Sequence, residues 1–376
     1  MRRILFCAST ASHLKRFHLP YLRAFREAGW EVWTAADTAE KVPYADRSEA
    51  LPLVKSMTSP QNAQAVLAAR KLLVEGRFDA VSVHTTLAAA AVRGAALTMK
   101  NRPRIFYTCH GYLFSGADSA ARRAMYLAPE KLCAPVTDVL MVMNREDREI
   151  AVKHRLSADG AVRFIPGMGV EFSRYARHFS GEERLAARRR FGYGEKDFLF
   201  VYAAEFSARK NHAFLLRAFA GTARRCPNAR LLLAGNGALR NQCIRLAQEL
   251  GVSGRVLFAG ELSGMEAIYP MCDAAVSTSR SEGLPFNVME AMAAGLPVAA
   301  TQVKGHEDLI RPGESGLLFS PDSPHAAAEA MTALYHSPGL CAKLADSASR
   351  SLNRYELSAV MPQILSVYRE FFPGEI

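Results

Sequence analysis

Glu282 and Glu290, two glutamates with seven residues between them, carry the clearest chemistry in this sequence. The apolar run 274–279 before them predicts a buried strand, and residues 287–294 predict a helix with Pro285 in its first turn. A helix N-terminus attracts anions, because its N–H groups lack intrahelical partners and its dipole is positive there. Glu282 can accept hydrogen bonds from sugar hydroxyls. Glu290 lies roughly one to two turns into the helix, at a rise of ~1.5 Å per residue, and can therefore reach a ribose. A nucleotide-sugar fits both ends; the alternative is one capping and one solvated glutamate.

This stretch resembles the E-x7-E motif of retaining glycosyltransferases, specifically glycosyltransferase family 4. The resemblance implies that Glu282 contacts the donor sugar, that Glu290 holds the ribose, and that the loop between them binds the diphosphate through backbone N–H groups. The loop residues assigned to donor binding are Gly283, Leu284, Pro285, Phe286 and Asn287.

Two basic residues, Arg209 and Lys210, follow the predicted strand 198–204. A cation in this turn, near the diphosphate, neutralises the departing nucleotide, so no metal is required. The segment resembles the family's Gly-Arg-x-x-x-x-Lys pattern, with Ala204 and Glu205 in place of Gly and Arg. Related exopolysaccharide transferases carry Gly-Glu-Leu followed by Lys-Asn, so this departure is typical of a subfamily. Which residue supplies the second positive charge stays open; Arg209 is the candidate, and ordinary surface basics are the alternative.

His110 ends the predicted strand 104–110 and precedes Gly111. A histidine can donate to a hydroxyl group or stabilise nearby charge at neutral pH. The Tyr-Thr-Cys-His-Gly-Tyr context resembles the family segment whose histidine contacts the donor sugar beside the anomeric carbon. We therefore assign His110 and Glu282 as catalytic residues, with a structural histidine as the alternative for His110.

The loop after the predicted strand 4–8 holds small hydroxyl residues where a dinucleotide-binding fold has glycines, so a G-x-G-x-x-G site is not supported. The resemblance puts this loop on the acceptor side, and the residues assigned there are Ser9, Thr10, Ser12 and His13. A second turn, Gly235-Asn236-Gly237, is expected to line the nucleotide base together with Leu262, largely through backbone contacts. Simple turn glycines are the alternative.

Three further segments resemble sequence motifs of bacterial capsular and exopolysaccharide glycosyltransferases. They are His84-Thr85-Thr86, Asn144-Arg145-Glu146-Asp147 and Gly167-Met168-Gly169-Val170-Glu171. Ser82 stands where the family's first histidine is usual, and Glu171 replaces an aspartate. The match spans nearly the whole chain and indicates that subfamily.

Short apolar runs alternate with helix-like segments, which is the rhythm of a doubly wound parallel α/β sheet. In the first half the predicted strands are 4–8, 31–35, 80–84, 104–110, 138–144 and 163–165, and the predicted helices include 17–28 and 63–75. A second series has predicted strands 198–204, 230–234, 255–259, 274–279, 297–301 and 316–319. Between the two series, the Arg- and Glu-rich segment that ends at Gly194 is predicted as the interdomain linker.

This organisation predicts two Rossmann-like domains, which by resemblance is the GT-B fold, with two doubly wound domains facing a central cleft. The expected boundaries are 1–175 for an acceptor-binding domain and 176–355 for a nucleotide-sugar-binding domain. Residues 356–376 are expected to form a C-terminal helix that crosses back to the first domain, with Pro362 inside it.

The composition is that of a folded globular protein, with 376 residues, 49% of them hydrophobic and 22% charged. Seven scattered cysteines without a C-x-x-C pair argue against a disulfide framework and a zinc site, and for a reducing cytosol. The short N-terminal apolar run is predicted as the first strand rather than a signal peptide. No run approaches the ~18 apolar residues of a membrane span.

The net charge of +11 favours anionic partners. The sequence has no zinc-finger spacing, RNP motif or basic zipper, so nucleic acid is not an expected partner. Arg122, Arg123 and Lys131 are interleaved with apolar residues. Such a segment suits the surface of an anionic bilayer, and a solvated helix face is the alternative.

Taken together, the resemblance implies a metal-independent, retaining transfer of an N-acetylhexosamine or hexose from a UDP-sugar to a polyprenyl-diphosphate-linked saccharide. The setting would be the assembly of a bacterial capsule or exopolysaccharide, in the cytoplasm at the inner face of the cell membrane. No cofactor other than the donor is expected. The alternatives are a UDP-sugar epimerase on the same fold, a transferase with a soluble acceptor, and a non-catalytic binding protein.

Overall fold

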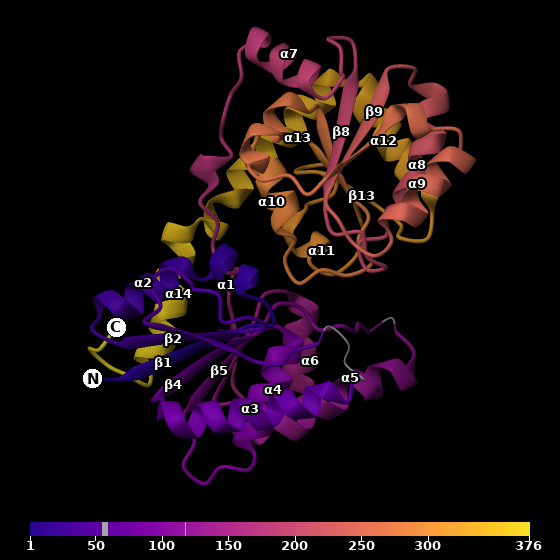
Figure 1. Cartoon of the computed structure of the whole chain (residues 1–376). Coiled ribbons are helices and arrows are strands. Elements are labelled where there is room, and N and C mark those ends of the chain that lie inside the picture. Colours follow the sequence, from indigo (N-terminus) through magenta and orange to yellow (C-terminus); the bar gives the residue numbers. More distant parts are fainter. Residues whose placement is uncertain (55–58, 117) are drawn as a thin grey trace. The chain divides into compact units, whose positions relative to one another are not determined.

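The computed structural model of the chain describes residues 1–54, 59–116 and 118–376. These residues form two compact units, of which one comprises Met1–Gly169 with Leu357–Ile376 and the other Val170–Glu356. In each unit, helices surround a sheet (Figure 1). The chain thus leaves the first unit after Gly169 and returns to it after Glu356, where the sequence analysis places boundaries after 175 and 355.

The first unit contains, among its described residues, a sheet of seven parallel strands in the order β3-β2-β1-β4-β5-β6-β7. The strands are β1 (Arg3–Cys7), β2 (Glu31–Ala36), β3 (Arg47–Ala50), β4 (Ala80–His84), β5 (Arg104–Cys109), β6 (Val139–Val142) and β7 (Val162–Phe164). The helices are α1 (Ala11–Phe17), α2 (Leu19–Glu27), α3 (Gln61–Gly76), α4 (Thr86–Ala96), α5 (Ala120–Cys133), η1 (Ala134–Val136), α6 (Arg145–His154) and α14 (Leu357–Arg369).

The second unit is described without a gap and contains a sheet of six parallel strands in the order β10-β9-β8-β11-β12-β13. The strands are β8 (Phe198–Ala203), β9 (Ala229–Ala234), β10 (Val256–Gly260), β11 (Ala274–Ser277), β12 (Val298–Thr301) and β13 (Leu317–Phe319). The α-helices are α7 (Gly181–Arg190), α8 (His212–Arg225), α9 (Arg240–Glu249), α10 (Phe286–Ala293), α11 (His306–Leu309), α12 (Pro324–His336) and α13 (Pro338–Ser351). The short 3-10 helices are η2 (Phe172–Arg174), η3 (Ser253–Arg255), η4 (Met265–Ala267), η5 (Tyr269–Met271) and η6 (Leu352–Tyr355).

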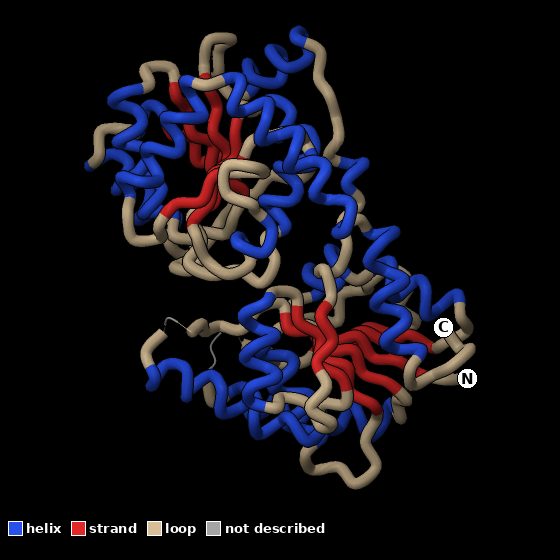
Figure 2. Tube along the Cα trace, turned by 180° about the vertical axis from the view of Figure 1, so that it is seen from behind, coloured by secondary structure: helices blue, strands red, loops and turns tan. Residues whose placement is uncertain are grey.

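Helices cover both faces of each sheet, as the tube view shows (Figure 2). Strands buried on both faces are apolar at nearly every position, because no side chain points to water. Both β4 and β6 are buried throughout, and β6 is accordingly a continuous apolar run, whereas β4 also contains Ser82 and His84. The same pattern made the central strands predictable from the sequence.

The last helix, α14, packs in the first unit. The ring of its Tyr368 stacks on Phe106 of β5, with centroids 4.3 Å apart, and meets Phe25 of α2 edge-on at 5.1 Å. The Tyr368 hydroxyl lies 2.6 Å from Oγ of Ser82 in β4. The C-terminal segment therefore supplies core side chains to the unit that begins the chain.

Three features of the fold differ from the sequence prediction. The prediction misses β3, because its Arg-Ser-Glu-Ala sequence is polar and it lies at the edge of the sheet. The predicted helix 17–28 corresponds to α2, which begins at Leu19 with a proline in its first turn, whereas α1, which ends at Phe17, is not predicted. The predicted linker contains α7, whose residues Ser180 and Glu183 form a capping box.

Both sheets have a switch point in their strand order. In the first unit β1 lies between β2 and β4, and in the second unit β8 lies between β9 and β11. Open parallel sheets bind ligands beyond the carboxyl ends of their strands at such a point. The loops that follow β1 and β4, and those that follow β8 and β11, are therefore the places where the fold can build a site.

Candidate active site

Glu282 and Lys210 form a buried ion pair in the second unit. Lys210 follows β8 and Glu282 follows β11, so both lie beyond the strand ends that flank the switch point. Nζ of Lys210 lies 2.5 Å from Oε1 of Glu282, and Nη1 of Arg209 lies 2.7 Å from Oε2. Two cations thus hold the two oxygens of one carboxylate, and Arg209, whose side chain is 46% exposed, lies on the solvent side.

The charges around Glu282 keep it ionised. Burial raises the pKa of Glu282, but Lys210 and Arg209 outweigh burial and hold that pKa at about 2. Burial lowers the pKa of Lys210, and the neighbouring Glu282 offsets part of that effect. Burial also lowers the pKa of His306 to about 4, so this ring, which interacts electrostatically with Glu282, is neutral at pH 7.

Gly305 fixes the loop that packs against Glu282. Its φ is +80°, and a Cβ atom at this position would lie 2.8 Å from the Cβ and from the carbonyl oxygen of Glu282. The N–H of Glu282 donates to the carbonyl of Lys304 at 3.3 Å. A glycine accepts this positive φ and leaves room for the contact. The position of Glu282 therefore depends on a residue that the sequence analysis does not single out.

Glu290 lies in α10 and is oriented by two tyrosines. Its carboxylate is buried; Oε1 accepts a hydrogen bond from the Tyr175 hydroxyl at 3.0 Å, and Oε2 accepts one from the Tyr269 hydroxyl at 3.1 Å. The Tyr269 hydroxyl also lies 3.3 Å from the backbone carbonyl of Asn287. α10 begins at Phe286 with Pro285 as its N-cap, one residue before the predicted start. Sequence reasoning names Glu290 but neither tyrosine, because both lie outside the motif.

Gly235 and Gly237 are required by backbone packing. A Cβ at Gly235 would lie 2.1 Å from the carbonyl oxygen of Ala204, and a Cβ at Gly237 would lie 2.6 Å from that of Phe206. The N–H of Phe206 donates to the carbonyl of Asn236 at 2.8 Å. This turn thus secures the segment that leads from β8 to Lys210. The glycines have a structural reason of their own, and their assignment to the nucleotide base, like that of the half-buried Leu262, stays a prediction.

In the first unit, the Asn-x-x-Asp motif anchors the turn that carries His110. His110 directly follows β5, and Gly111 has a φ of +118°. The N–H of Tyr112 donates to Oδ2 of Asp147 at 3.2 Å, and the same oxygen accepts a hydrogen bond from Nδ2 of Asn144 at 2.7 Å. In the sequence this motif indicates only the subfamily. In the structure it also positions the turn that carries His110.

The hydroxyl residues after β1 stabilise their own loop. Oγ of Ser9 lies 2.6 Å from Oγ1 of Thr85, which follows β4. Thr10 caps α1 by accepting the N–H of His13 at 3.2 Å, and the exposed Ser12 donates to Thr10 at 3.1 Å. These bonds close the β1–α1 turn without the glycines of a dinucleotide site, and the acceptor-side assignment stays a prediction.

Four histidines gather at the carboxyl ends of β1, β4 and β5, where His84 is the last residue of β4. The ring centroids of His18 and His84 are 3.8 Å apart, and those of His13 and His110 are 4.8 Å apart. Burial lowers the pKa of His13 to about 4 and the pKa values of His18, His84 and His110 well below the usual value, so all four rings are neutral at pH 7. The sequence analysis singles out all but His18, which lies inside the stretch predicted as one helix.

Comparisons with known proteins decide the family. The sequence model of the family described as "Glycosyl transferases group 1" matches residues 183–351, and that of the family "Glycosyltransferase Family 4" matches residues 21–168. EpsD of Bacillus subtilis (strain 168), which is named as a glycosyltransferase, is 34% identical over 371 residues, covering 98% of this chain and 97% of that protein. The chain belongs to glycosyltransferase family 4.

Two further comparisons extend this result. The family 4 glycosyltransferase is 23% identical over 272 residues to the UDP-Gal:alpha-D-GlcNAc-diphosphoundecaprenol alpha-1,3-galactosyltransferase of Escherichia coli, covering 72% of this chain and 68% of that one. The structure of Anabaena Alr3699/HepE in complex with UDP and glucose matches with a TM-score of 0.78 at 17% identity, covering 98% and 100% of the two chains. Together with the two parallel α/β units, the structural likeness shows the GT-B fold.

The helix α5 of this glycosyltransferase presents a mixed basic and apolar surface. Its Met125 and Leu132 are 57% and 66% exposed, and Arg122 and Arg123 lie on the same helix. Across residues 1–54, 59–116 and 118–376, no helix combines the length and the apolar character needed to cross a membrane.

Proposed function

We propose that this family 4 glycosyltransferase is a retaining enzyme that transfers a sugar from a UDP-sugar to a saccharide linked to a polyprenyl diphosphate, in the assembly of a bacterial surface polysaccharide. The observation that carries the proposal is the arrangement of Lys210, Arg209 and Glu282 at the switch point of the second sheet. Fixed cations at this point suit a diphosphate, and a fixed carboxylate beside them suits sugar hydroxyls.

The proposed leaving group is UDP, and its charge is met by the chain's own residues. An ammonium group has three donors, so Lys210 keeps two for phosphate oxygens while it holds Glu282. The first turn of α10 adds the positive end of a helix dipole. Stabilisation of this kind acts on charge that develops in the transition state, and we propose that it requires neither a metal nor another cofactor.

The proposed donor contacts divide by residue. Glu282 binds hydroxyl groups of the sugar, and Glu290, oriented by Tyr175 and Tyr269, binds the ribose. His110 is assigned a contact with the sugar near the anomeric carbon. UDP-Gal, in the name of the Escherichia coli galactosyltransferase, and UDP, in the Anabaena complex, support a uridine nucleotide.

The interactions of the two carboxylates support the proposed stereochemical outcome. Retaining hydrolases use one carboxylate as a nucleophile and a second as an acid. Here Glu282 is engaged by two cations and Glu290 by two phenols. We therefore propose front-face substitution, in which the departing phosphate accepts the proton of the acceptor hydroxyl as that oxygen bonds to the anomeric carbon.

A lipid-linked acceptor requires the enzyme to work at a membrane surface. The diphosphoundecaprenol in the name of the Escherichia coli relative supports such an acceptor. The exposed Met125 and Leu132 and the arginines of α5 support peripheral contact with anionic lipid on the inner face of the cell membrane.

The proposal is tested in two steps with purified protein. Calorimetry first compares the binding of UDP-, GDP- and ADP-sugars, and the tightest donor is then incubated with polyprenyl-diphosphate saccharides while the new linkage is analysed by NMR. We expect a UDP-sugar to bind and the anomeric configuration to be retained. A product with inverted configuration would refute the retaining mechanism. Conversion of the donor without an acceptor would indicate an epimerase. Equally efficient transfer to a soluble sugar would refute the proposal of a lipid-linked acceptor.

A further inference from the structure

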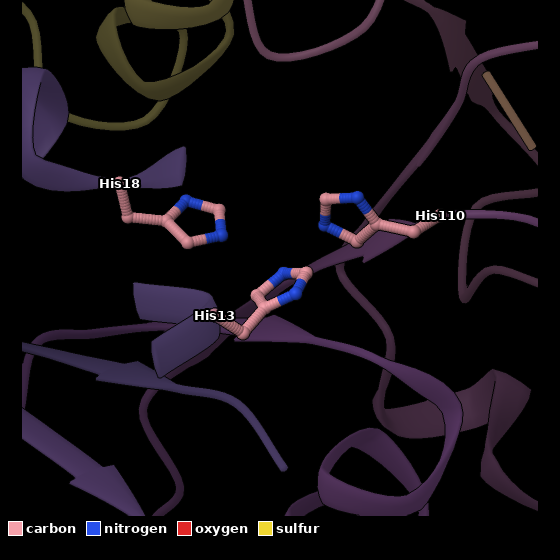
Figure 3. A group of neighbouring side chains, drawn as sticks. All are labelled: His13, His18 and His110. Atoms are coloured by element: carbon pink, nitrogen blue, oxygen red, sulfur yellow. The ribbon is translucent and has the colours of Figure 1, made fainter. Parts of the chain in front are cut away.

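Three histidine rings of the first unit converge on one space (Figure 3). His13 lies on α1, His18 lies between α1 and α2, and His110 follows β5. One ring nitrogen of each residue lies within 4.8 Å of the corresponding nitrogens of the other two. Nitrogen ligands at ~2.0–2.1 Å from a tetrahedral zinc ion lie roughly 3.4 Å from one another. Each pair of nitrogens is therefore at most about 1.4 Å from the spacing of a metal site.

His18 is the strongest indication that this space takes a ligand. Its side chain is fully buried, and among the described residues neither of its ring nitrogens has a hydrogen-bond partner; the same holds for Nε2 of His13. A buried polar group without a hydrogen-bond partner destabilises the folded protein, so a ligand that binds it is favoured. His13 and His110 are only partly buried, which gives a small ion access to the space.

His84 borders the same space, and Ser82 orients its ring. Its Nδ1 lies 3.3 Å from Nε2 of His110, and its Nε2 lies 2.9 Å from Oγ of Ser82. When Ser82 accepts the Nε2 proton, Nδ1 of His84 presents a lone pair toward His110. Hydrogen bonds of this kind fix the tautomer and the orientation of metal-binding imidazoles.

We propose that His13, His18 and His110 form a binding site for a divalent cation of the zinc type, and that Nδ1 of His84 orients the His110 ring. Neutral imidazoles suit zinc, copper and nickel, whereas magnesium and calcium select oxygen ligands. The site shares His110 with the donor-sugar contact proposed above, although the proposed transfer itself uses no metal. One consequence rests on the proposed function: a cation bound to His110 removes that side chain from the donor sugar and inhibits transfer.

The experiment measures metal binding directly. Tag-free protein is stripped with a chelator, and Zn²⁺ affinity is determined by competition with a chromophoric chelator; Co²⁺ then serves as an optical probe of the ligands. We expect one Zn²⁺ per chain and Co²⁺ bands of nitrogen ligation without thiolate charge transfer. His18→Phe should weaken Zn²⁺ binding by at least about 100-fold. His13→Phe tests the same site at a less buried position.

The matched control is His212→Phe in the second unit. His212 is also buried with both ring nitrogens unpartnered among the described residues, but it stacks on Phe206 at 4.0 Å and belongs to no group of three such ligands. Its replacement should leave Zn²⁺ affinity unchanged.

The proposal is overturned if the wild-type chain binds no stoichiometric Zn²⁺ at micromolar concentration. It is equally overturned if variants at His18 and His13 that keep the wild-type circular dichroism spectrum also keep its affinity, or if Co²⁺ shows thiolate ligation. Transfer is assayed separately. Inhibition by Zn²⁺ that a chelator reverses supports both the site and the role of His110, whereas full activity with bound Zn²⁺ leaves the site standing and refutes that role.

Discussion

Lys210 and Glu282 are 72 residues apart in the sequence, yet Nζ of one lies 2.5 Å from Oε1 of the other. The neighbouring strands β8 and β11 bring the two loops together. A cation held in this way needs little reorganisation when a diphosphate arrives, and preorganised charge is the form of electrostatic stabilisation that enzymes use most.

Replacing Lys210 with Met should slow transfer more than it weakens donor binding. The lost ammonium acts on charge that develops on the leaving nucleotide, so we expect kcat to fall by about 10²–10³ and the donor KM to change less. Steady-state kinetics with Lys196→Met, an exposed lysine of the same unit, provide the control. A Lys210→Met enzyme with a kcat near that of the control would contradict the proposed role.

Replacing Glu282 with Gln should destabilise the fold in a pH-dependent manner. The folded-state pKa of Glu282 is lowered from 4.5 to about 2, so its contribution is present above pH 4.5 and is lost as pH falls toward 2. At pH 7 we expect a loss on the order of 3 kcal/mol in the free energy of unfolding, since Lys210 remains buried without its partner. Urea denaturation at pH 7 and pH 3 should show that the difference from wild type narrows in acid. A constant difference would mean that the ion pair does not stabilise the fold.

Replacing Tyr269 or Tyr175 with Phe should raise the donor KM and leave kcat nearly unchanged. Each change removes one hydrogen bond to Glu290, worth about 0.5–1.5 kcal/mol, which corresponds to roughly a 2- to 12-fold effect on donor affinity. Tyr193→Phe is the matched control, because the buried Tyr193 hydroxyl has no hydrogen-bond partner among the described residues. Isothermal titration with UDP measures the affinity of each variant. An affinity that is unchanged in both the Tyr269 and the Tyr175 variant would contradict the proposed role of Glu290 in ribose binding.

Replacing Gly305 with Ala should lower activity by displacing Glu282. The new Cβ would meet atoms of Glu282 at 2.8 Å, in addition to the cost of φ +80°. Gly313→Ala isolates the second effect, since Gly313 has φ +73° and nothing within 4 Å of an added Cβ. We expect similar losses of stability from backbone strain, about 1 kcal/mol each, and a loss of transfer in Gly305→Ala alone. Equal activity of the two variants would show that this contact does not position Glu282.

The sequence predicts the parts of this protein that follow from local patterns. Central strands such as β6 are apolar throughout because both faces are buried, and Glu282 and Lys210 stand in motifs of recognisable spacing. Residues that act through tertiary packing are not visible in this way. Gly305 looks like an ordinary turn glycine until Glu282 is placed beside it, and the edge strand β3 has no apolar pattern to reveal it.

The partners of the site residues show the same limit. Tyr175 and Tyr269 lie 115 and 21 residues from Glu290 in the sequence, and no motif connects them to it. His18 lies within the predicted helix 17–28, whereas in the structure it stands between α1 and α2. In each case the fold, rather than the spacing, brings the groups together.

The place of α14 in the first unit sets an order of events during synthesis. Tyr368 lies against Phe106 and Phe25, so the surface that these rings share stays open until the last residues have left the ribosome. The second unit has all of its strands and helices by Glu356 and can fold before then. The part of the protein that is translated first is therefore the part that is finished last, and a chain cut short at residue 356 would leave its amino-terminal half as the damaged one.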